Sequence, residues 1–401
     1  QITNISRRNL LKGFALTGFV LAVGMPFSSF AEDEEAPKYG RDAMPNGWVD
    51  NPLIFVAIAE DGTVTIVCHR SEMGQGVRTS LPMVVADELE ADWDRVKVIQ
   101  APGDEARYGN QDTDGSRSVR HFFMPMRNVG AAARMMLEAA AAAHWCVGVD
   151  EVFAENHHIK HKSSGKTMSY GDLAKAASAL DVPESEKLQL KKADQFRYIG
   201  KQSTKLIDGE DIVTGKAIYG IDVQVDGMVH AVIARPPVYG GKVKSYDDSE
   251  ALKVPGVIKV VTLKGSPPPA VFNPLGGVAV IAENTWAAMQ GREKLKIEWD
   301  HGDNASYNSD EYRQQMLQAA STSGGKVLRS SGDVAKALET ADKTFKADYY
   351  IPHLSQAPME PPVATARIQD GKCEVWAPTQ AAQAGRDTVA KWLEMPAEDV
   401  T

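Results

Sequence analysis

Residues 72–79 read Glu-Met-Gly-Gln-Gly-Val-Arg-Thr, so that one glutamine, Gln75, stands between two glycines. Glycine has no Cβ, and backbone N–H groups beside it can therefore come close to a bound group. The residues before this stretch alternate between apolar and polar from residue 54 to residue 67, with Asp61-Gly62 in the middle. That pattern predicts a β-hairpin closed by a tight primed turn. The hairpin leads directly into a loop that is suited to ligand binding.

A helix is expected to follow this loop. Thr79 or Ser80 can cap it, and Leu81, Val85 and Leu89 recur at four-residue spacing on one face. The glycines would then lie at a helix N-terminus, where unpaired N–H donors and the helix dipole favour an anion. A short Gly-x-Gly sequence can also be no more than a turn, and that alternative is decided by the rest of the chain.

Two further stretches accompany the loop, namely Val-Ala-Asp-Glu-Leu at residues 85–89 and Trp-Asp-Arg-Val-Lys-Val at residues 93–98. Together with residues 72–79 they resemble the molybdopterin-binding segment of the xanthine oxidase family. The position near the N-terminus resembles the branch that contains isoquinoline 1-oxidoreductase β-subunits and membrane-associated bacterial aldehyde dehydrogenases. The resemblance implies a mixed fold, α+β or α/β, in which molybdopterin-binding segments carry an inserted hammerhead α/β domain.

The first residues resemble an export signal. Arg7 and Arg8 stand in a twin-arginine pattern, an apolar run covers residues 14–25, and Ser29-Phe30-Ala31 provides a small-x-small cleavage pattern. The apolar run is shorter than the roughly 20 residues of a membrane-spanning helix. We therefore expect a signal peptide over residues 1–31, a linker over residues 32–51 and a periplasmic protein. Cleavage of the signal and its retention as an anchor at the inner membrane are both open.

Composition restricts the class of protein. A chain of 401 residues with 43% hydrophobic residues predicts several globular domains. The net charge is −9 and no basic block follows the signal, which argues against nucleic-acid binding. Cys68, Cys146 and Cys373 have neither zinc nor iron–sulfur spacing. They are interpreted as buried thiols, with one disulfide as the alternative, and any iron–sulfur cluster would belong to a partner.

A second polar loop occupies residues 111–120 and contains Gly115, Ser116, Arg117 and Ser118. It resembles the second molybdopterin-contacting loop of the family, although a solvated surface loop is the alternative. Hydroxyl, N–H and guanidinium groups are what a phosphorylated cofactor requires. The loop is expected to lead into an alanine-rich helix that has Pro125 in its first turn and runs to about residue 143.

Three histidines, His157, His158 and His161, follow without a carboxylate or cysteine at ligand spacing. They predict an exposed edge or turn rather than a metal site. The resemblance implies a molybdopterin-binding segment over residues 52–200 and a hammerhead domain over residues 207–302. Residues 326–401 would form the first part of a further molybdenum-binding domain. Residues 345–351 are expected to form a strand.

Pro-Thr-Gln at residues 378–380 resembles a motif of that last domain. The resemblance places Gln380 in the second coordination sphere of the molybdenum, where an amide can donate a hydrogen bond without displacing a ligand. Glu360 could be taken for a general base, but its counterpart in the family is structural. The family's glycine-rich loop and its catalytic glutamate are expected beyond Thr401, so the chain is interpreted as the N-terminal part of a longer polypeptide.

The resemblance implies a molybdenum hydroxylase catalytic subunit that uses water as the oxygen source. Its expected cofactor is the molybdopterin cytosine dinucleotide form, held by Gly74, Gln75 and Gly76 with residues 115–118. Electrons would leave through a small subunit with two [2Fe–2S] clusters and a c-type cytochrome. Aldehydes and N-heterocycles are both open as substrates. A different class remains as an alternative, namely an exported scaffold protein that keeps the fold without the cofactor.

Overall fold

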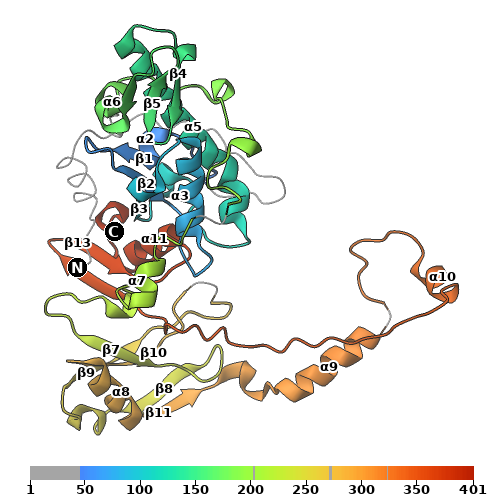
Figure 1. Cartoon of the computed structure of the whole chain (residues 1–401). Coiled ribbons are helices and arrows are strands. Elements are labelled where there is room, and N and C mark those ends of the chain that lie inside the picture. The colour runs from blue at the N-terminus through green and yellow to red at the C-terminus, as the bar shows by residue number, and fades with distance from the viewer. Residues whose placement is uncertain (1–45, 202–203, 271–272, 323) are drawn as a thin grey trace. The chain divides into compact units, whose positions relative to one another are not determined.

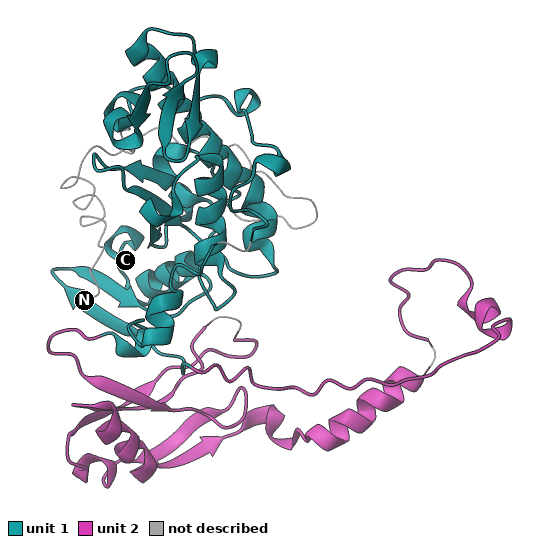
Figure 2. Ribbon diagram, viewed as in Figure 1, with its two compact units in different colours: residues 1–223, 360–401 teal, residues 224–359 magenta. Residues whose placement is uncertain are grey.

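The computed structural model describes residues 46–201, 204–270, 273–322 and 324–401. The predicted signal peptide, and the linker as far as residue 45, lie outside the described residues. The chain divides into two compact units, which Figure 2 shows in different colours. The first unit extends to Val223 and also contains Glu360–Thr401, and the second is Gln224–Met359. The predicted domain bounds at residues 200, 207 and 326 stay predictions.

A three-stranded sheet lies at the centre of the first unit (Figure 1). Strands β1 (Val56–Ile58) and β2 (Val64–Cys68) pair antiparallel, and β3 (Val96–Gln100) pairs parallel with β2. A parallel neighbour requires a crossover connection, and α3 (Val77–Glu88) with the 3-10 turn η1 (Trp93–Arg95) provides it. The predicted strand at residues 96–99 is confirmed, and so is the hairpin, except that its first strand begins at Val56 because Ile54 and Phe55 belong to the short helix α2 (Pro52–Phe55).

Helix α5 (Arg117–Trp145) covers the same core as α3, and the two helices lie side by side in Figure 1. Leu81, Val85 and Leu89 are each at most 1% exposed, which confirms their shared buried face. The two helices approach closely at Gly130, where an added Cβ would lie 2.4 Å from the carbonyl oxygen of Val85. Short helices α2 (Pro52–Phe55) and α4 (Glu105–Tyr108) flank the sheet.

A small antiparallel sheet follows α5, in the strand order β4-β5-β6. It consists of β4 (Val152–Glu155), β5 (His158–His161) and β6 (Thr167–Ser169), with the 3-10 turn η2 (Val149–Glu151) before it. Helix α6 (Tyr170–Ala177) comes next, and its N-cap Ser169 accepts the Asp172 N–H in a capping box.

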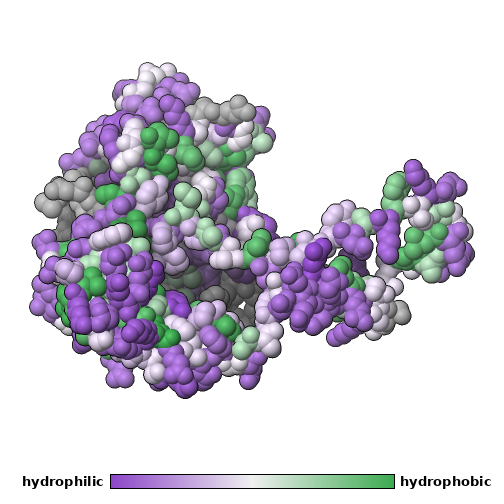
Figure 3. Space-filling view, turned by 90° about the horizontal axis from the view of Figure 1, so that it is seen from below, coloured by the Kyte–Doolittle hydropathy of each residue, from purple (hydrophilic) through white to green (hydrophobic). Residues whose placement is uncertain are grey.

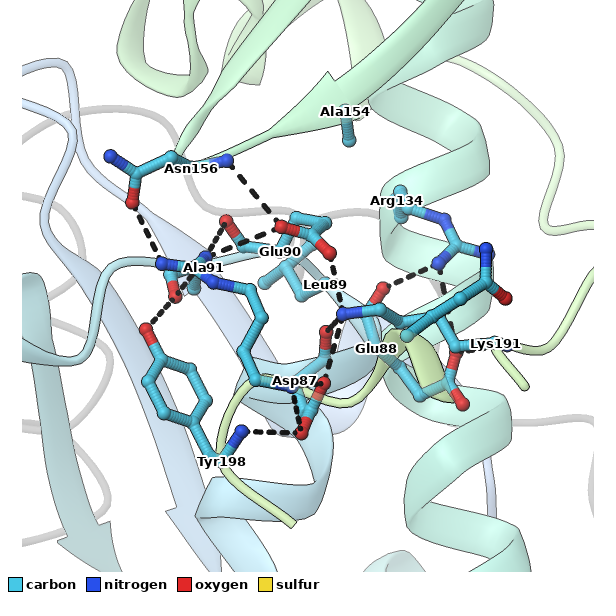
Figure 4. A network of polar contacts seen from close by, with 12 residues as sticks. Asp87, Glu88, Leu89, Glu90, Ala91, Arg134, Ala154, Asn156, Lys191 and Tyr198 are labelled. Atoms are coloured by element: carbon cyan, nitrogen blue, oxygen red, sulfur yellow. Dashed lines mark hydrogen bonds and ion pairs between the residues drawn. The ribbon is translucent and has the colours of Figure 1, made fainter. Parts of the chain in front are cut away.

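The chain then returns across the C-terminal end of α3, where buried charges hold it (Figure 4). Asp87 is fully buried, and its carboxylate accepts the backbone N–H groups of Tyr198 and Ile199, each at 2.9 Å. Lys191 donates to the same carboxylate at 2.9 Å. Burial alone would raise the pKa of Asp87, but these hydrogen bonds outweigh it and the pKa is lowered. The acid therefore stays ionised and fixes residues 191–199 on the helix.

Glu88, the next residue, is also fully buried. The guanidinium of Arg127 lies 2.7 Å from its carboxylate and that of Arg134 lies 3.6 Å away, and both arginines come from α5. A buried carboxylate is tolerated when cations and N–H groups surround it. The remaining elements of the unit are η3 (Ser185–Lys187), η4 (Ala193–Gln195), α7 (Gly209–Thr214), η5 (Gly220–Asp222), β12 (Thr365–Gln369), β13 (Lys372–Trp376), α11 (Ala382–Leu393) and η8 (Ala397–Asp399).

The second unit has two antiparallel sheets, in the orders β7-β10-β9 and β11-β8. Its small core contains Ala251, Val260, Val278 and Val280. The chain then continues through α9 and α10 into residues without regular structure. On the face drawn in Figure 3, hydrophobic residues lie scattered between hydrophilic ones. The elements are β7 (His230–Ala234), β8 (Lys242–Asp247), η6 (Ala251–Lys253), β9 (Val257–Leu263), β10 (Gly277–Ala282), α8 (Thr285–Lys294), β11 (Lys296–Asp300), η7 (Gly302–Ser306), α9 (Ser309–Ser321) and α10 (Val334–Glu339).

Several local predictions are wrong. The hairpin turn is not a primed turn, because Gly62 has a positive φ but Glu60 and Asp61 do not. Helix α5 begins at Arg117, eight residues before Pro125, because the buried face of the helix already includes Phe122. Residues 345–351 form no strand, because no neighbouring segment among the described residues pairs with them.

Two expectations about exposure are also wrong. His157 is 1% exposed, because its Nε2 lies 2.7 Å from the Gly62 carbonyl and its Nδ1 accepts the Asp92 N–H. Cys146 is an exposed thiol at the end of α5, whereas Cys68 and Cys373 are buried, and none of the three forms a disulfide. In the described ranges, no cluster of His, Cys, Asp or Glu could hold a metal ion, and none of the helices there is long and apolar enough to cross a bilayer.

The crossing of α3 and α5 gives a stability prediction. Gly130→Ala should lower the free energy of unfolding by about 1–3 kcal/mol, because its Cβ would overlap the backbone of α3. Gly385→Ala in α11 is the matched control, since no atom lies within 4 Å of its Cβ. It should raise the free energy of unfolding by up to about 1 kcal/mol through helix propensity. Urea denaturation measures both, and equal effects would contradict the close packing.

Candidate functional site

Two loops leave the same edge of the central sheet. The first loop, residues 69–76, follows β2, and the second loop, residues 101–116, follows β3. Because β2 and β3 are parallel neighbours, their carboxyl ends lie side by side and so do the loops. Ligands of open α/β sheets bind outside such carboxyl ends. The candidate site is therefore placed by the strand pairing itself.

Thr113 joins three segments that are far apart in sequence. Its hydroxyl oxygen accepts the Ser71 N–H at 2.9 Å and the hydroxyl donates to the Ser71 carbonyl at 3.1 Å. Its carbonyl accepts the side-chain amide of Gln380 at 2.7 Å, and its own N–H donates to the Gln380 carbonyl at 2.9 Å. The first loop, the second loop and the Pro-Thr-Gln motif thus meet at one residue.

The start of α11 is fixed on the second loop by further contacts. Gln383 accepts the Glu105 N–H at 3.0 Å, and Arg386 donates to the Gly103 carbonyl at 2.8 Å. Gly103 has no room for a side chain, because its Cβ would lie 2.7 Å from the Ala382 carbonyl oxygen. Gln380 itself is exposed, so its amide lies at an accessible rim of the site.

The first loop is organised around Glu72. The carboxylate accepts the N–H groups of Gly74 at 2.7 Å, Gly76 at 2.9 Å and Arg78 at 3.0 Å. Gly76, not Thr79 or Ser80, is the N-cap of α3, so the predicted cap is wrong. The physical reason is that Glu72 already supplies the oxygen atoms that a serine or threonine cap would provide.

The side chain of Gln75 turns back onto its own loop. Its oxygen accepts the Met73 N–H at 2.6 Å and its amide donates to the Ser71 carbonyl at 3.2 Å. The residue is nevertheless exposed, as are Met73 and Gly74. The amide of Gln75 is therefore held by its own loop at an exposed position.

The predicted residues of the second loop lie at the N-terminus of α5. Gly115 and Ser116 both have positive φ, 50° and 55°, and Ser116 is an N-cap whose side chain makes no capping hydrogen bond. The Arg117 guanidinium lies 3.4 Å from the Asp114 carboxylate. Ser118 is buried and its hydroxyl oxygen accepts Nε of Arg70 at 3.0 Å. Three of the four residues thus lie at the surface, and Ser118 faces inward.

Sequence reasoning missed Arg70, which is completely buried behind the second loop. Its guanidinium donates to the carbonyl and the side-chain oxygen of Asn110, both at 2.8 Å, and to the Asp112 carbonyl. It also lies 5.0 Å from the centre of the Phe122 ring. Burial lowers the pKa of Arg70 to about 10, so it remains a cation at neutral pH. Its position two residues before the stretch 72–79 was the available sequence signal.

His69 is buried as well, next to Arg70 in sequence. Its ring packs against Phe55 and Phe122, with ring centroids 5.3 and 4.5 Å away. Neither ring nitrogen has a hydrogen-bond partner among the described residues. Burial lowers the pKa of His69 to about 3, so the imidazole is neutral.

Glu360 lies apart from these loops in the first unit. Its carboxylate accepts the Ile221 N–H at 2.9 Å. It also lies close to Gly220, whose Cβ would be 3.1 Å from it. The first unit ends at Val223 and resumes at Glu360. The contact therefore joins the two parts of the unit close to the points where the chain leaves it and returns, which gives Glu360 a structural role.

Comparison with known proteins identifies the family of this chain. A family described as molybdopterin cofactor-binding domain matches residues 3–232. The chain belongs to this family. A second family with the same description matches residues 320–401.

Curated relatives of this molybdopterin-binding chain agree with the branch that the sequence predicted. A membrane-bound aldehyde dehydrogenase [pyrroloquinoline-quinone] from Gluconacetobacter polyoxogenes is 31% identical over 99% of this chain and 50% of its own length. Isoquinoline 1-oxidoreductase subunit beta from Brevundimonas diminuta is 31% identical over 90% of this chain and 51% of its own length. The chain thus spans about half the length of these two relatives, and the predicted resemblance is confirmed.

A solved structure, aldehyde oxidoreductase from Desulfovibrio gigas, covers 48% of this chain and 25% of its own. Its sequence identity is 22% and its TM-score is 0.36, which is too low to carry an argument. The mixed α/β fold rests instead on the sheets and helices described above and on the family match.

The donors of the site fit an anionic cofactor on one side only. On the side of the first loop, the N–H groups of Gly74 and Gly76 are used by Glu72. On the side of the second loop, Gly115 and Ser116 are exposed at the start of a helix of 29 residues, whereas the Arg117 N–H donates to the Asp114 carbonyl at 2.9 Å, and the buried cation Arg70 lies behind them. Cations and helix N-termini stabilise bound phosphate. The residues therefore fit the phosphorylated part of the cofactor at Gly115–Arg117.

The unpartnered imidazole gives a prediction about stability and pH. His69→Leu should raise the free energy of unfolding by about 1 kcal/mol at pH 5, because it removes a buried polar group without a partner. The folded-state pKa of His69 is about 3 and the unfolded value about 6.5, so its neutral form contributes fully above pH 6.5. This contribution is lost as pH falls from 6.5 to 3. Urea denaturation across that range should show a flatter pH dependence for the variant, and an identical pH dependence would refute the assignment.

Proposed function

We propose that this chain is the N-terminal part of the catalytic subunit of a molybdenum hydroxylase. One observation carries the proposal, namely the meeting of the two loops and the Pro-Thr-Gln motif at Thr113. Ser71, Thr113 and Gln380 meet at one sheet edge, where Gln380 is exposed, and the chain belongs to a molybdopterin cofactor-binding family. The names of the curated relatives, an aldehyde dehydrogenase and an isoquinoline oxidoreductase, support oxidation of an aldehyde or an N-heterocycle.

The cofactor would supply a redox centre at which substrate is oxidised, with water as the oxygen source. The protein's own residues bind and orient it. Gly115, Ser116 and Arg117 hold the phosphate, and Ser118 holds Arg70 in place behind them. Gln380 orients the metal face through its side-chain amide, and Gln75 contributes a second amide from the first loop. The general base is proposed to come from a glutamate beyond Thr401.

Electron transfer and location form the second part of the proposal. Relatives named as subunits support a multi-subunit enzyme. The proposed partners are a small subunit with two [2Fe–2S] clusters and a c-type cytochrome, and the proposed cofactor form is the cytosine dinucleotide. Arg7 and Arg8 are proposed to direct export to the periplasm. Replacing both with lysine should retain the protein in the cytoplasm, and unchanged periplasmic yield in cell fractionation would argue against this route.

Elemental and nucleotide analysis of the full-length protein, purified with its partners, tests the cofactor. We expect molybdenum and released CMP, each near one per chain. One relative is named for pyrroloquinoline quinone, so the same sample should be extracted for that quinone. Quinone without molybdenum would overturn the proposal. Neither cofactor in folded protein would favour the alternative, a scaffold that keeps the fold without the chemistry.

Substitution of the two amides tests the site. Gln75→Ala and Gln380→Ala should each lower molybdenum content or kcat by about 10- to 100-fold, as outer-sphere partners of metals commonly do. Gln318→Ala, an exposed glutamine in α9, is the matched control and should change neither. The assays use an aldehyde and isoquinoline as separate substrates. Wild-type values for both site variants would remove these assignments.

A further inference from the structure

The Glu72 carboxylate lies inside the turn of the first loop. In addition to the N–H groups of Gly74, Gly76 and Arg78, it accepts the Met73 N–H at 3.2 Å, a donor that it shares with the closer Gln75 oxygen, so three backbone donors and part of a fourth converge on one side chain. Successive N–H groups that point into one concavity are an anion-binding arrangement. Here the anion belongs to the chain itself.

The conformation of the two glycines makes this wrapping possible. Gly74 has φ 100° and Gly76 has φ 82°, both in the left-handed region that favours glycine. A Cβ on Gly76 would also lie 3.3 Å from a methyl group of Leu206, which covers the loop. The conformation turns the N–H groups toward Glu72 and leaves Gln75 exposed between the glycines.

The neighbouring cations are also committed to internal partners. Arg78 donates to both carboxylate oxygens of Asp208, at 2.8 and 3.2 Å. Arg70 donates to carbonyl oxygens of the second loop and to Ser118. Arg78 interacts with Glu72 electrostatically but makes its side-chain hydrogen bonds to Asp208. An anionic group that approached the first loop would therefore meet the Glu72 carboxylate, and like charges at short distance repel.

The N–H groups of residues 73, 74, 76 and 78 form a concavity that we call the amide cradle. We propose that Glu72 is a positioning residue whose carboxylate permanently fills this cradle. The part of this inference that concerns contact between the loop and the cofactor rests on the proposed function. Glu72 holds the loop in shape for the exposed Gln75 side chain. It also excludes the cofactor's phosphate from the glycine N–H groups, which leaves the phosphate to Gly115–Arg117.

Chemical rescue tests the cradle without any cofactor. Thermal unfolding of cofactor-free full-length protein is measured in acetate and in chloride at equal ionic strength. Glu72→Ala should lower Tm by at least about 2 °C in chloride, and acetate should restore it saturably by occupying the vacated cradle. Wild type and the control Glu186→Ala, an exposed glutamate, should show no difference between the two salts. Stabilisation of wild type by acetate or phosphate to the same extent would overturn the proposal, because the cradle would then be open.

If Glu72→Ala does not fold, Glu72→Gln is tested in the same thermal unfolding experiment. It keeps one acceptor oxygen and the size of the side chain, so its Tm should lie between those of wild type and Glu72→Ala and should not respond to acetate. A Tm equal to that of wild type would show that the carboxylate is not needed.

Molybdenum content separates this inference from the proposed function. In protein assembled with its partners, Glu72→Ala should contain at least about 10-fold less molybdenum, and growth and purification in acetate should restore it. A loop that merely failed to fold would not recover in acetate. Wild-type molybdenum content in Glu72→Ala would overturn the inference while leaving the proposed function intact. Absence of molybdenum from wild type would end the proposed function, and the thermal rescue would still decide the role of Glu72.

Discussion

The parallel pairing of β2 with β3 is the constraint on which the site depends. Strands that pair parallel must end at the same edge, and the chain must cross over between them. The crossover is α3, and the two loops that leave the shared edge are brought within hydrogen-bonding distance through Ser71 and Thr113. Residues 379–386 then attach to the same edge through Gln380 and Arg386. An antiparallel arrangement of these strands would place the two loops at opposite ends of the sheet.

Helix α3 is held by carboxylates at both ends. At its N-terminus Glu72 collects backbone N–H groups, and near its C-terminus Asp87 and Glu88 collect N–H groups, lysine and arginine. The twelve residues of the helix separate these anchors by about 18 Å at 1.5 Å per residue. Desolvation makes both buried acids costly unless all their partners remain. The helix is consequently tied to α5 and to residues 191–199, and the first loop is positioned by contacts far beyond itself.

The sequence was a good guide wherever the signal was local. The hairpin, the buried face of α3 and strand β3 follow from alternation and helical spacing, and they were predicted. Glu72 was overlooked because a glutamate before glycines has no special meaning until the loop closes around it. Arg70 and the Asp87 network depend on partners 40 to 112 residues away. The expected strand at residues 345–351 has the right alternation, but alternation does not supply a neighbouring strand.

That unpaired segment has a consequence for the behaviour of the chain in solution. Phe345, Tyr349 and Ile351 alternate with polar residues, and each is at least 83% exposed. An extended apolar segment with unpaired backbone groups can recruit the same segment of another molecule and so begin aggregation. Lys346 and Asp348 interrupt it with charges of opposite sign, and Pro352 follows directly after Ile351, which are devices that limit edge-to-edge growth. Lys346, Asp348 and Pro352 thus act against self-association of this segment.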